Sequence, residues 1–228
     1  CSVLEMYYKP FVGFCQSDVP TTTHKTVVPC RIMWYNSCDD TLKGVPAMLD
    51  IFDILGPVMI GPSSSHTAGA ARIGAMARTL LGAPPVKAAI HLYGSFAETG
   101  SGHGTDRALV GGLLGMKPDD PRLPNAFEEA KKAGLTYTID EIKLRDAHPN
   151  TAVIDAESAD GKTLTMQASS IGGGRIMVNK LDGIDVNFNG MFNTLVIRNE
   201  DASGTVAAVT SILSQLRINV ANMSLYRH

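Results

Sequence analysis

The chain has 228 residues, of which 44% are hydrophobic, and its 20 Lys and Arg oppose 22 Asp and Glu, which gives a net charge of −2. This balance lacks the basic patch that binding to a nucleic-acid backbone requires, so no nucleic-acid partner is expected. The longest apolar runs are a few residues, far below the roughly 20 that span a bilayer, and no signal-peptide pattern is visible. We therefore expect a cytoplasmic protein of one or two domains without a membrane segment.

The first 47 residues differ in composition from the rest of the chain. They hold the only Trp and all the cysteines, and they show no sustained hydrophobic period of 2 or 3.6. The cysteines are Cys1, Cys15, Cys30 and Cys38. Their spacings include no C-x-x-C pair, so a zinc site is not indicated. We expect residues 1–47 to be a non-native or poorly structured leader outside the folded core, because regular patterning begins after Met48.

Residues 50 to 135 show mostly helical patterns. A helix is predicted over 66–81, where Ile73, Met76 and Leu80 share one face, and Gly82 is placed to end it. The other expected elements are a strand over 86–93, a glycine-rich loop over 94–104, and helices over about 105–114 and 126–133. An α+β domain is therefore predicted, beginning near residue 48.

Residues 151 to 228 are richer in strands. Two hairpins are predicted, one turning at Asp160-Gly161 between 151–157 and 162–168, the other at Asp182-Gly183 between 175–180 and 184–188. After a linker at Asn189-Gly190, a β-α-β unit is expected from a strand over 192–198, a helix over 205–216 and a strand over 218–225. The predicted fold is α+β over 48–189, followed by a βαβ unit over 190–228.

The segment before the first helix is rich in hydroxyl groups. Ser63, Ser64 and Ser65 precede His66 and Thr67, and side-chain hydroxyls at a helix start cap free backbone N–H groups. The same N–H groups favour an anion such as a carboxylate. The helix dipole disfavours the imidazolium form of His66, and neutral imidazole is the form that acts as a base. The alternative interpretation is an ordinary N-cap with a surface histidine.

A second polar segment covers residues 94–107 and contains several glycines. Gly102 and its neighbouring glycines allow backbone amides to approach a ligand closely, and His103 lies among them. Thr105 or Asp106 is placed to cap the next helix. The pattern is not G-x-G-x-x-G and no Walker lysine follows, so dinucleotide or nucleotide binding is not expected. The alternative is a flexible connection with an exposed histidine.

Four segments carry a resemblance to a known family. The sequence ILGPVMIGPSSSHT over 54–67 resembles the opening of the β subunit of iron–sulfur-dependent L-serine dehydratases. The glycine-rich segment over 94–108, the HPNT turn over 148–151 and SIGGG over 170–174 resemble its later loops, in the same order. A chance match to one glycine loop would not give this series.

The resemblance implies a domain over 48–189 with a mixed sheet and flanking helices. It also implies a lyase of amino-acid catabolism and gluconeogenesis that deaminates L-serine to pyruvate and ammonia. In the family a [4Fe-4S] cluster acts as Lewis acid on the substrate hydroxyl, and a base removes the Cα proton. In the two-chain type the cluster cysteines belong to an α subunit, which agrees with the absence of cysteine after Cys38. This chain would be inactive without that subunit, and would supply the proton-handling and carboxylate-binding side of the site.

The residues implied for that site come from the first two segments, and none of them is a metal ligand. The catalytic candidates are His66 and His103. The substrate-binding candidates are Ser63, Ser64, Ser65, Thr67, Gly102, Thr105 and Asp106.

The C-terminal β-α-β unit resembles the first half of an ACT domain, a βαββαβ ligand-sensing module. DASGTV over 201–206 is similar to its strand-to-helix turn, with Ser203 where Pro is usual, and INVA over 218–221 is similar to its second strand. The resemblance implies a truncated ferredoxin-like module and a homo-oligomer formed through either domain. Two rival interpretations remain: an allosteric anion-binding module with an ACT domain, as in some D-3-phosphoglycerate dehydrogenases, and a purely structural subunit.

Overall fold

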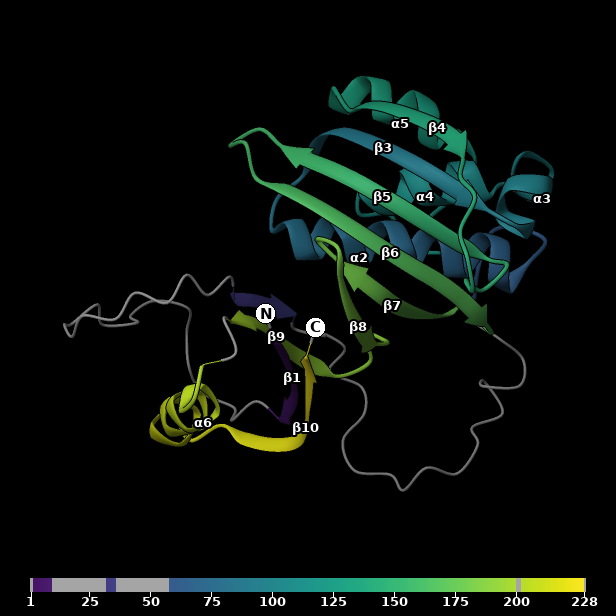
Figure 1. Cartoon of the computed structure of the whole chain (residues 1–228). Coiled ribbons are helices and arrows are strands. Elements are labelled where there is room, and N and C mark those ends of the chain that lie inside the picture. Colours follow the sequence, from purple (N-terminus) through teal and green to yellow (C-terminus); the bar gives the residue numbers. More distant parts are fainter. Residues whose placement is uncertain (1, 10–31, 36–57, 200–201, 228) are drawn as a thin grey trace. The chain divides into compact units, whose positions relative to one another are not determined.

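The computed structural model describes residues 2–9, 32–35, 58–199 and 202–227. The chain divides into two compact units, a larger one of residues 38–190 and a smaller one that joins 1–37 to 191–228. Each unit contains a sheet in its described part (Figure 1). No helix among the described residues is long and apolar enough to cross a bilayer.

The larger unit is built on a mixed six-stranded sheet, as predicted. Its strands, in spatial order, are β4 (Thr136–Glu141), β3 (Pro85–Tyr93), β5 (Thr151–Ser158), β6 (Thr163–Gly172), β7 (Arg175–Leu181) and β8 (Ile184–Phe188). β3 and β4 run parallel, and the other neighbours are antiparallel. Both predicted hairpins are confirmed. β4 was not predicted, because it is an edge strand with no buried residue and shows no alternation strong enough to mark it.

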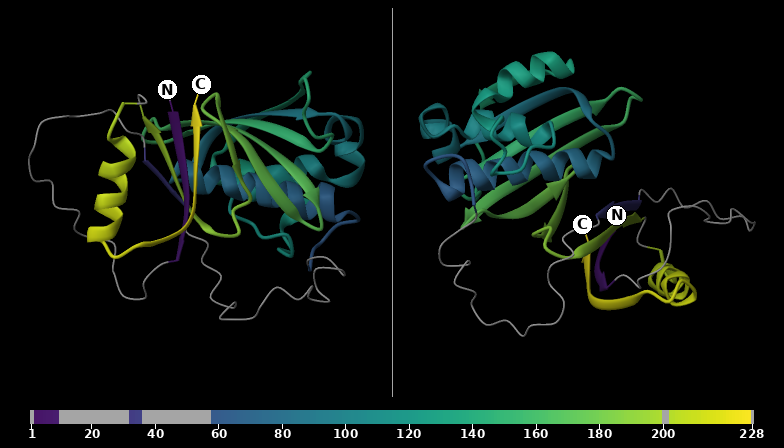
Figure 2. Two further views of the ribbon diagram at one scale, coloured as in Figure 1. Left: turned by 60° about the horizontal axis from the view of Figure 1, so that its bottom comes forward. Right: turned by 180° about the vertical axis from the view of Figure 1, so that it is seen from behind.

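Helices cover one face of this sheet (Figures 1 and 2). They are a π-helical turn η1 (Ser64–Gly69), α2 (Ala70–Leu81), α3 (Ser95–His103), α4 (Thr105–Leu113), a short 3₁₀ turn η2 (Leu123–Asn125) and α5 (Ala126–Ala133). The predicted helix 66–81 is confirmed as η1 continued by α2, and its predicted apolar face is buried. Gly82 adopts the left-handed conformation that ends the helix.

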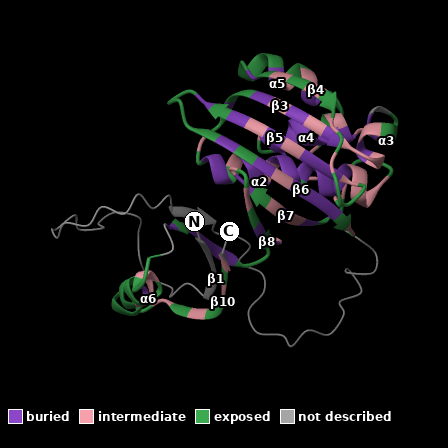
Figure 3. Ribbon diagram, in the orientation of Figure 1, coloured by how far each residue is buried: buried purple, intermediate pink, exposed green. Residues whose placement is uncertain are grey.

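Two glycines let α2 and α4 pack backbone to backbone. A Cβ on Gly74 would lie 2.2 Å from the carbonyl oxygen of Leu109, and a Cβ on Gly112 would lie 2.1 Å from that of Ala71. Neither distance accommodates a methyl group, and both neighbours are main chain. In Figure 3 the ribbons of α2 and α4 are coloured mostly as buried. This close contact fixes the position of α4, including its first turn.

The expectation of a loop over 94–104 is wrong, because most of this segment is the helix α3. Gly94 at φ 58° turns the chain out of β3, and α3 ends at Gly104, which has φ 71°. Between them Phe96 is fully buried and anchors the first turn. The apolar anchor outweighs the low helix propensity of the interior glycines, which local propensity alone does not reveal.

The smaller unit contains a four-stranded antiparallel sheet and one described helix, α6 (Thr205–Gln215). The sheet order is β10 (Asn219–Arg227), β1 (Ser2–Lys9), β9 (Asn193–Asn199) and β2 (Ile32–Tyr35). The predicted β-α-β unit is thus confirmed as β9, α6 and β10. Its buried core is formed by Leu195, Ile197 and Leu213, with partly buried apolar side chains around them.

Two segments of residues 1–47, which were expected to be poorly structured, form strands of this sheet. β1 lies between β9 and β10, and β2 pairs with the other edge of β9. β9 and β10 therefore run parallel with one strand between them, the split arrangement found in ferredoxin-like modules. The pairing partners of β1 lie at the opposite end of the chain, so no local periodicity marks them. The rest of the leader lies outside the described residues.

Candidate functional site

His66 lies in the first turn of the η1–α2 helix. Ser63 is the N-cap in an extended conformation, and its Oγ accepts a hydrogen bond from the His66 backbone N–H at 3.2 Å. The predicted capping role is therefore confirmed for Ser63. η1 is a π-helical turn, a form that occurs mostly as single turns and often at functional sites.

Three hydroxyl groups surround the imidazole of His66. Nδ1 lies 3.3 Å from the Oγ of Ser63, and Nε2 lies 3.1 Å from the Oγ of Ser95 and 3.0 Å from the Oγ1 of Thr99. Ser95 and Thr99 are four residues apart in α3, so they share one face of that helix. The helical conformation of the segment expected to be a loop is what brings both hydroxyls to the same nitrogen.

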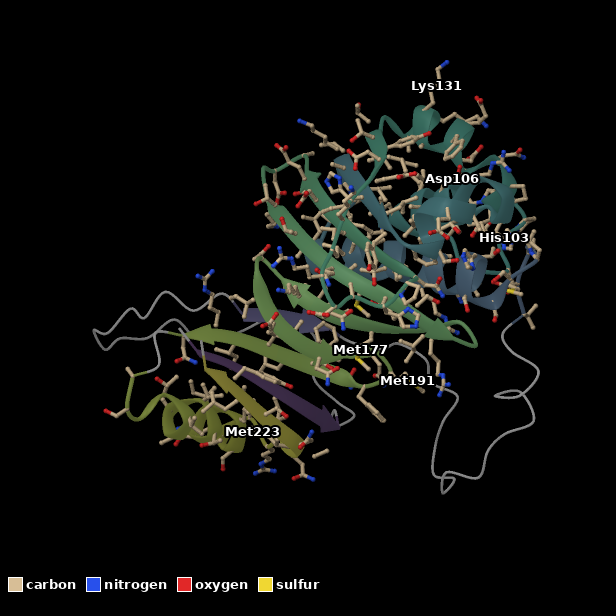
Figure 4. All side chains as sticks on the ribbon, turned by 45° about the vertical axis from the view of Figure 1, so that its right-hand side comes forward. His103, Asp106, Lys131, Met177, Met191 and Met223 are labelled. Carbon is tan, nitrogen blue, oxygen red and sulfur yellow. The ribbon has the colours of Figure 1, made fainter. Side chains whose placement is uncertain are left out.

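His103, the last residue of α3, lies beside His66. The two ring centroids are 5.0 Å apart with the planes tilted by 55°. The rings of His66 and Phe96 meet edge to face, with centroids 5.3 Å apart. The Thr67 hydroxyl donates to the backbone carbonyl of His103 at 3.3 Å. The two histidine-bearing segments predicted from the sequence are thus held together, with His103 exposed and labelled in Figure 4.

The pKa of His66 is lowered from 6.5, first because burial penalises its charged form and further because a charge on His103 repels it. A hydrogen bond with the Ser95 backbone acts in the opposite direction and raises the pKa in part. His66 is therefore neutral and able to accept a proton at neutral pH. The direction agrees with the sequence-based expectation, although burial rather than the helix dipole is the largest cause.

A pocket of about 180 Å³ is lined by His103, whose ring neighbours that of His66. Its polar lining comes from Thr67, His103 and Arg107, and Gly102 contributes main chain. Arg107 is exposed and lies over the ring of Phe127 at 5.9 Å. The pocket thus combines a cation, an imidazole and a glycine wall, a combination suited to a small anionic molecule.

The remaining predicted site residues fall into two groups. Ser64 and Ser65 are partly buried in η1 next to His66. Thr105 is fully buried, and its hydroxyl has no hydrogen-bond partner among the described residues. Asp106 accepts from the backbone N–H of Arg107 and is not bonded to His66. Its charge is one cause, after burial, of the raised pKa of Tyr137 on β4, and it lies toward α5 in Figure 4.

The two later turns of the resemblance meet the first two segments at this end of the larger unit. A Cβ on Gly94 would lie 2.7 Å from the carbonyl oxygen of Pro149, and a Cβ on Gly69 would lie 2.0 Å from the Oγ of Ser170. The Ser170 N–H donates to the carbonyl of Asn150 at 2.9 Å. These contacts bring the later turns against the first two segments, and at both contacts glycine leaves room for the neighbour.

Sequence reasoning missed Ser95, Thr99 and Arg107 as site residues. All three lie inside the matched segments, but only a helix over Ser95–His103 places Ser95 and Thr99 on the face toward His66. The i, i+4 spacing of the two hydroxyls was the available signal. Within the described residues, no group of three or more His, Cys, Asp or Glu is arranged to hold a metal ion.

Comparison with known proteins identifies the family. The family described as serine dehydratase beta chain matches residues 47–181. The chain is 44% identical over 180 residues to the probable L-serine dehydratase, beta chain, of Bacillus subtilis, which covers 78% of this chain and 80% of that protein. This chain belongs to the serine dehydratase beta chain family.

Other relatives agree. The L-serine dehydratase beta chain of Peptoniphilus asaccharolyticus is 40% identical over 174 residues, or 76% of this chain and 78% of that protein. L-serine dehydratase 2 of Escherichia coli is 31% identical over 157 residues, which are 57% of this chain but 33% of that longer protein. These matches favour the dehydratase over the two rival interpretations.

Proposed function

We propose that this chain is the β subunit of an L-serine dehydratase, which deaminates L-serine to pyruvate and ammonia together with an α subunit. Two beta chains, 44% and 40% identical over most of their length, support the activity and the two-subunit organisation. The observation that carries the proposal is His66, a partly buried neutral histidine held by three hydroxyl groups and next to His103, which lines a small pocket.

In this proposal His66 removes the Cα proton of serine. Its lowered pKa keeps the imidazole free to accept a proton at neutral pH. The neighbouring His103 is exposed, and in this proposal it passes the proton between His66 and water. The hydroxyl of Thr67 already donates to the His103 backbone, so Thr67 contributes by joining the two segments rather than by donating to substrate.

The substrate carboxylate is proposed to bind at the start of η1. Ser64 and Ser65 offer hydroxyl donors there, and Arg107 in the adjoining pocket supplies the positive charge that a carboxylate pairs with. Gly102 leaves the pocket wall open. Thr105 is fully buried and does not line the pocket, and neither it nor Asp106 is assigned a contact with substrate.

The [4Fe-4S] cluster of this enzyme type does not fit the described residues of this chain. Such clusters are held by cysteine thiolates, and residues 39–228 contain no cysteine. We assign the cluster to the cysteine-bearing α subunit, and derive for this chain proton handling and carboxylate binding only. Anaerobic reconstitution of the chain alone with iron and sulfide should therefore give no [4Fe-4S] absorbance. A stoichiometric cluster on the isolated chain would contradict this division.

We further propose a cytoplasmic assembly in which β9, α6 and β10 belong to an effector-sensing ACT domain. The split β-α-β arrangement of these elements supports that assignment. A homo-oligomer formed through this unit or through the larger one completes the proposal. Its test is the mass of the purified assembly, with and without an amino-acid effector.

The direct test of the activity is co-expression with candidate cysteine-bearing partners, followed by an anaerobic assay of serine-dependent pyruvate. Neither chain alone should form pyruvate, whereas the pair should. Ser64→Ala should raise KM with little change in kcat, because a carboxylate contact is shared by ground and transition states. Ser203→Ala, an exposed residue of the smaller unit, is the matched control. An assembled pair with an intact cluster that forms no pyruvate would contradict the proposal.

A further inference from the structure

The hydroxyl of Thr99 is shared between two neighbours that compete for its one proton. Its Oγ1 donates to the backbone carbonyl of Ser95 at 2.8 Å, one helical turn earlier. The same oxygen lies 3.0 Å from Nε2 of His66. Because a threonine hydroxyl has a single proton, a Thr99 that donates to the Ser95 carbonyl faces His66 with a lone pair.

This lone pair decides which ring nitrogen carries the proton. A neutral imidazole has one N–H and one acceptor nitrogen. If Nε2 bears the proton, it donates toward the Oγ1 of Thr99 and toward the Oγ of Ser95 at 3.1 Å. If Nε2 is unprotonated, its lone pair lies 3.0 Å from that of Thr99 with no proton between them. In the first arrangement Nε2–H has an acceptor at both hydroxyls. In the second the Ser95 hydroxyl can donate to Nε2, but the Thr99 contact is repulsive, so the Thr99 contact favours the first.

The other side of the ring is consistent with the same tautomer. The Oγ of Ser63 accepts the His66 backbone N–H at 3.2 Å, which leaves its own proton free. That proton points to an acceptor when Nδ1 of His66, 3.3 Å away, is unprotonated. The Nε2–H group and the Ser63 hydroxyl then both have acceptors.

We infer that Thr99 and Ser95 are positioning residues that hold neutral His66 in the Nε2–H tautomer, so that Nδ1, beside the Ser63 hydroxyl, is the nitrogen that accepts a proton. Its catalytic meaning rests on the proposed function. In that reaction the Ser63 hydroxyl turns its proton away from Nδ1, the Cα–H bond of serine breaks, an Nδ1–H bond forms, and the electron pair stays on Cα while His66 becomes imidazolium. Thr99 and Ser95 touch neither substrate nor the accepting nitrogen.

The tautomer is measurable without any activity, by imidazole nitrogen NMR of the full chain labelled with ¹⁵N. At a pH above the His66 titration, wild type should show a protonated Nε2 and an unprotonated Nδ1. Thr99→Val, which removes the acceptor, should shift the two ¹⁵N resonances toward a mixture of tautomers, and Thr99→Ser should restore them. A wild type with a protonated Nδ1, or a Thr99→Val spectrum unchanged at His66, would overturn the inference.

A matched control comes from the same helical contact elsewhere. Thr79 on α2 donates to the Ala75 carbonyl at 2.8 Å and is hydrogen-bonded to no histidine in the described structure. Thr79→Val should therefore leave the His66 resonances where they are. If Thr99→Val fails to fold, Ser95→Ala is the second variant, and it should weaken the Nε2–H state in the same direction.

Kinetics of the assembled enzyme separate this inference from the proposed function. Thr99→Val should lower kcat by roughly tenfold to a hundredfold, the range found when partners that orient a histidine are removed, with KM little changed and Thr99→Ser near wild type. One outcome is a tautomer shift in Thr99→Val together with wild-type kcat in both Thr99→Val and His66→Ala. It would refute His66 as the base but would support the tautomer assignment. A loss of kcat without a tautomer shift would refute the assignment.

Discussion

The two units of this chain assemble their sheets from differently spaced segments. In the larger unit β5, β6, β7 and β8 pair in sequence order through short hairpins. In the smaller unit Ser2 of β1 pairs with Arg227 of β10, so strands from the two ends of the chain lie side by side. Pairing between consecutive strands is indicated in the sequence by the turn residues between them. Pairing between strands far apart in the sequence is indicated by no local sequence pattern and requires closure of a long loop.

This difference predicts that the smaller unit depends on β1, the strand that separates β9 from β10. Met6→Pro should abolish the protection of residues 193–199 and 219–227 from hydrogen exchange, because proline removes a ladder donor from a central strand. Several hydrogen bonds of about 1 kcal/mol each are at risk. Mass-spectrometric exchange of the β5–β8 strands serves as the internal control.

The sequence alone predicts the opposite, since an unstructured leader should be removable with less than about 1 kcal/mol of change in stability. Unchanged protection of β9 and β10 after Met6→Pro would restore that view and refute the observed pairing.

Within the larger unit the sharpest stability test is the α2–α4 contact. Gly112→Ala should lower the free energy of unfolding by about 1–3 kcal/mol or more, because its methyl group meets main chain that cannot rotate away. Gly102→Ala is the control, since a Cβ there meets nothing within 4 Å, and it should unfold within about 0.5 kcal/mol of wild type. Urea unfolding of both variants measures the difference. Equal losses would show that the close approach of the helices is not limiting.

The smallest expected effect is electrostatic. Because a charge on His103 lowers the pKa of His66, His103→Gln should raise the pKa of His66 toward 6.5 without reaching it, since burial remains the larger cause. The pKa of His66 is lower in the folded chain than in the unfolded chain. As the pH drops from 6.5 toward the folded pKa, the unfolded chain binds the proton first, so the stability of the fold should fall. NMR titration of His66 in both proteins measures the shift. A lower pKa in His103→Gln would contradict the sign.

Much of the larger unit was predictable because its signals are local. Asp182 and Gly183 both have positive φ, at 47° and 79°, as the tight hairpin turn requires. The helix over 126–133 ends at Gly134 as predicted, with φ 74°. At the site, the capping by Ser63 and the position of His66 followed from residue type and order.

The residues missed depend on tertiary contacts. Ser95 and Thr99 reach His66 only because the buried Phe96 holds a glycine-containing segment in a helix. β4 depends on its parallel pairing with β3, and β1 on strands from the far end of the chain. In each case a distant partner supplies the stabilisation, and nothing in the segment itself records it.

In the function we propose, His66 is the proton acceptor that this chain brings to the assembled enzyme. The most direct measurement compares His66→Ala and His103→Ala in complex with the α subunit, under anaerobic conditions and at saturating serine. His66→Ala should lower kcat by about 10²–10⁴-fold with little change in KM, the range expected for loss of a positioned general base, while His103→Ala should lose much less. Wild-type kcat in His66→Ala, with the cluster of the α subunit intact, would contradict the role of His66 as the proton acceptor.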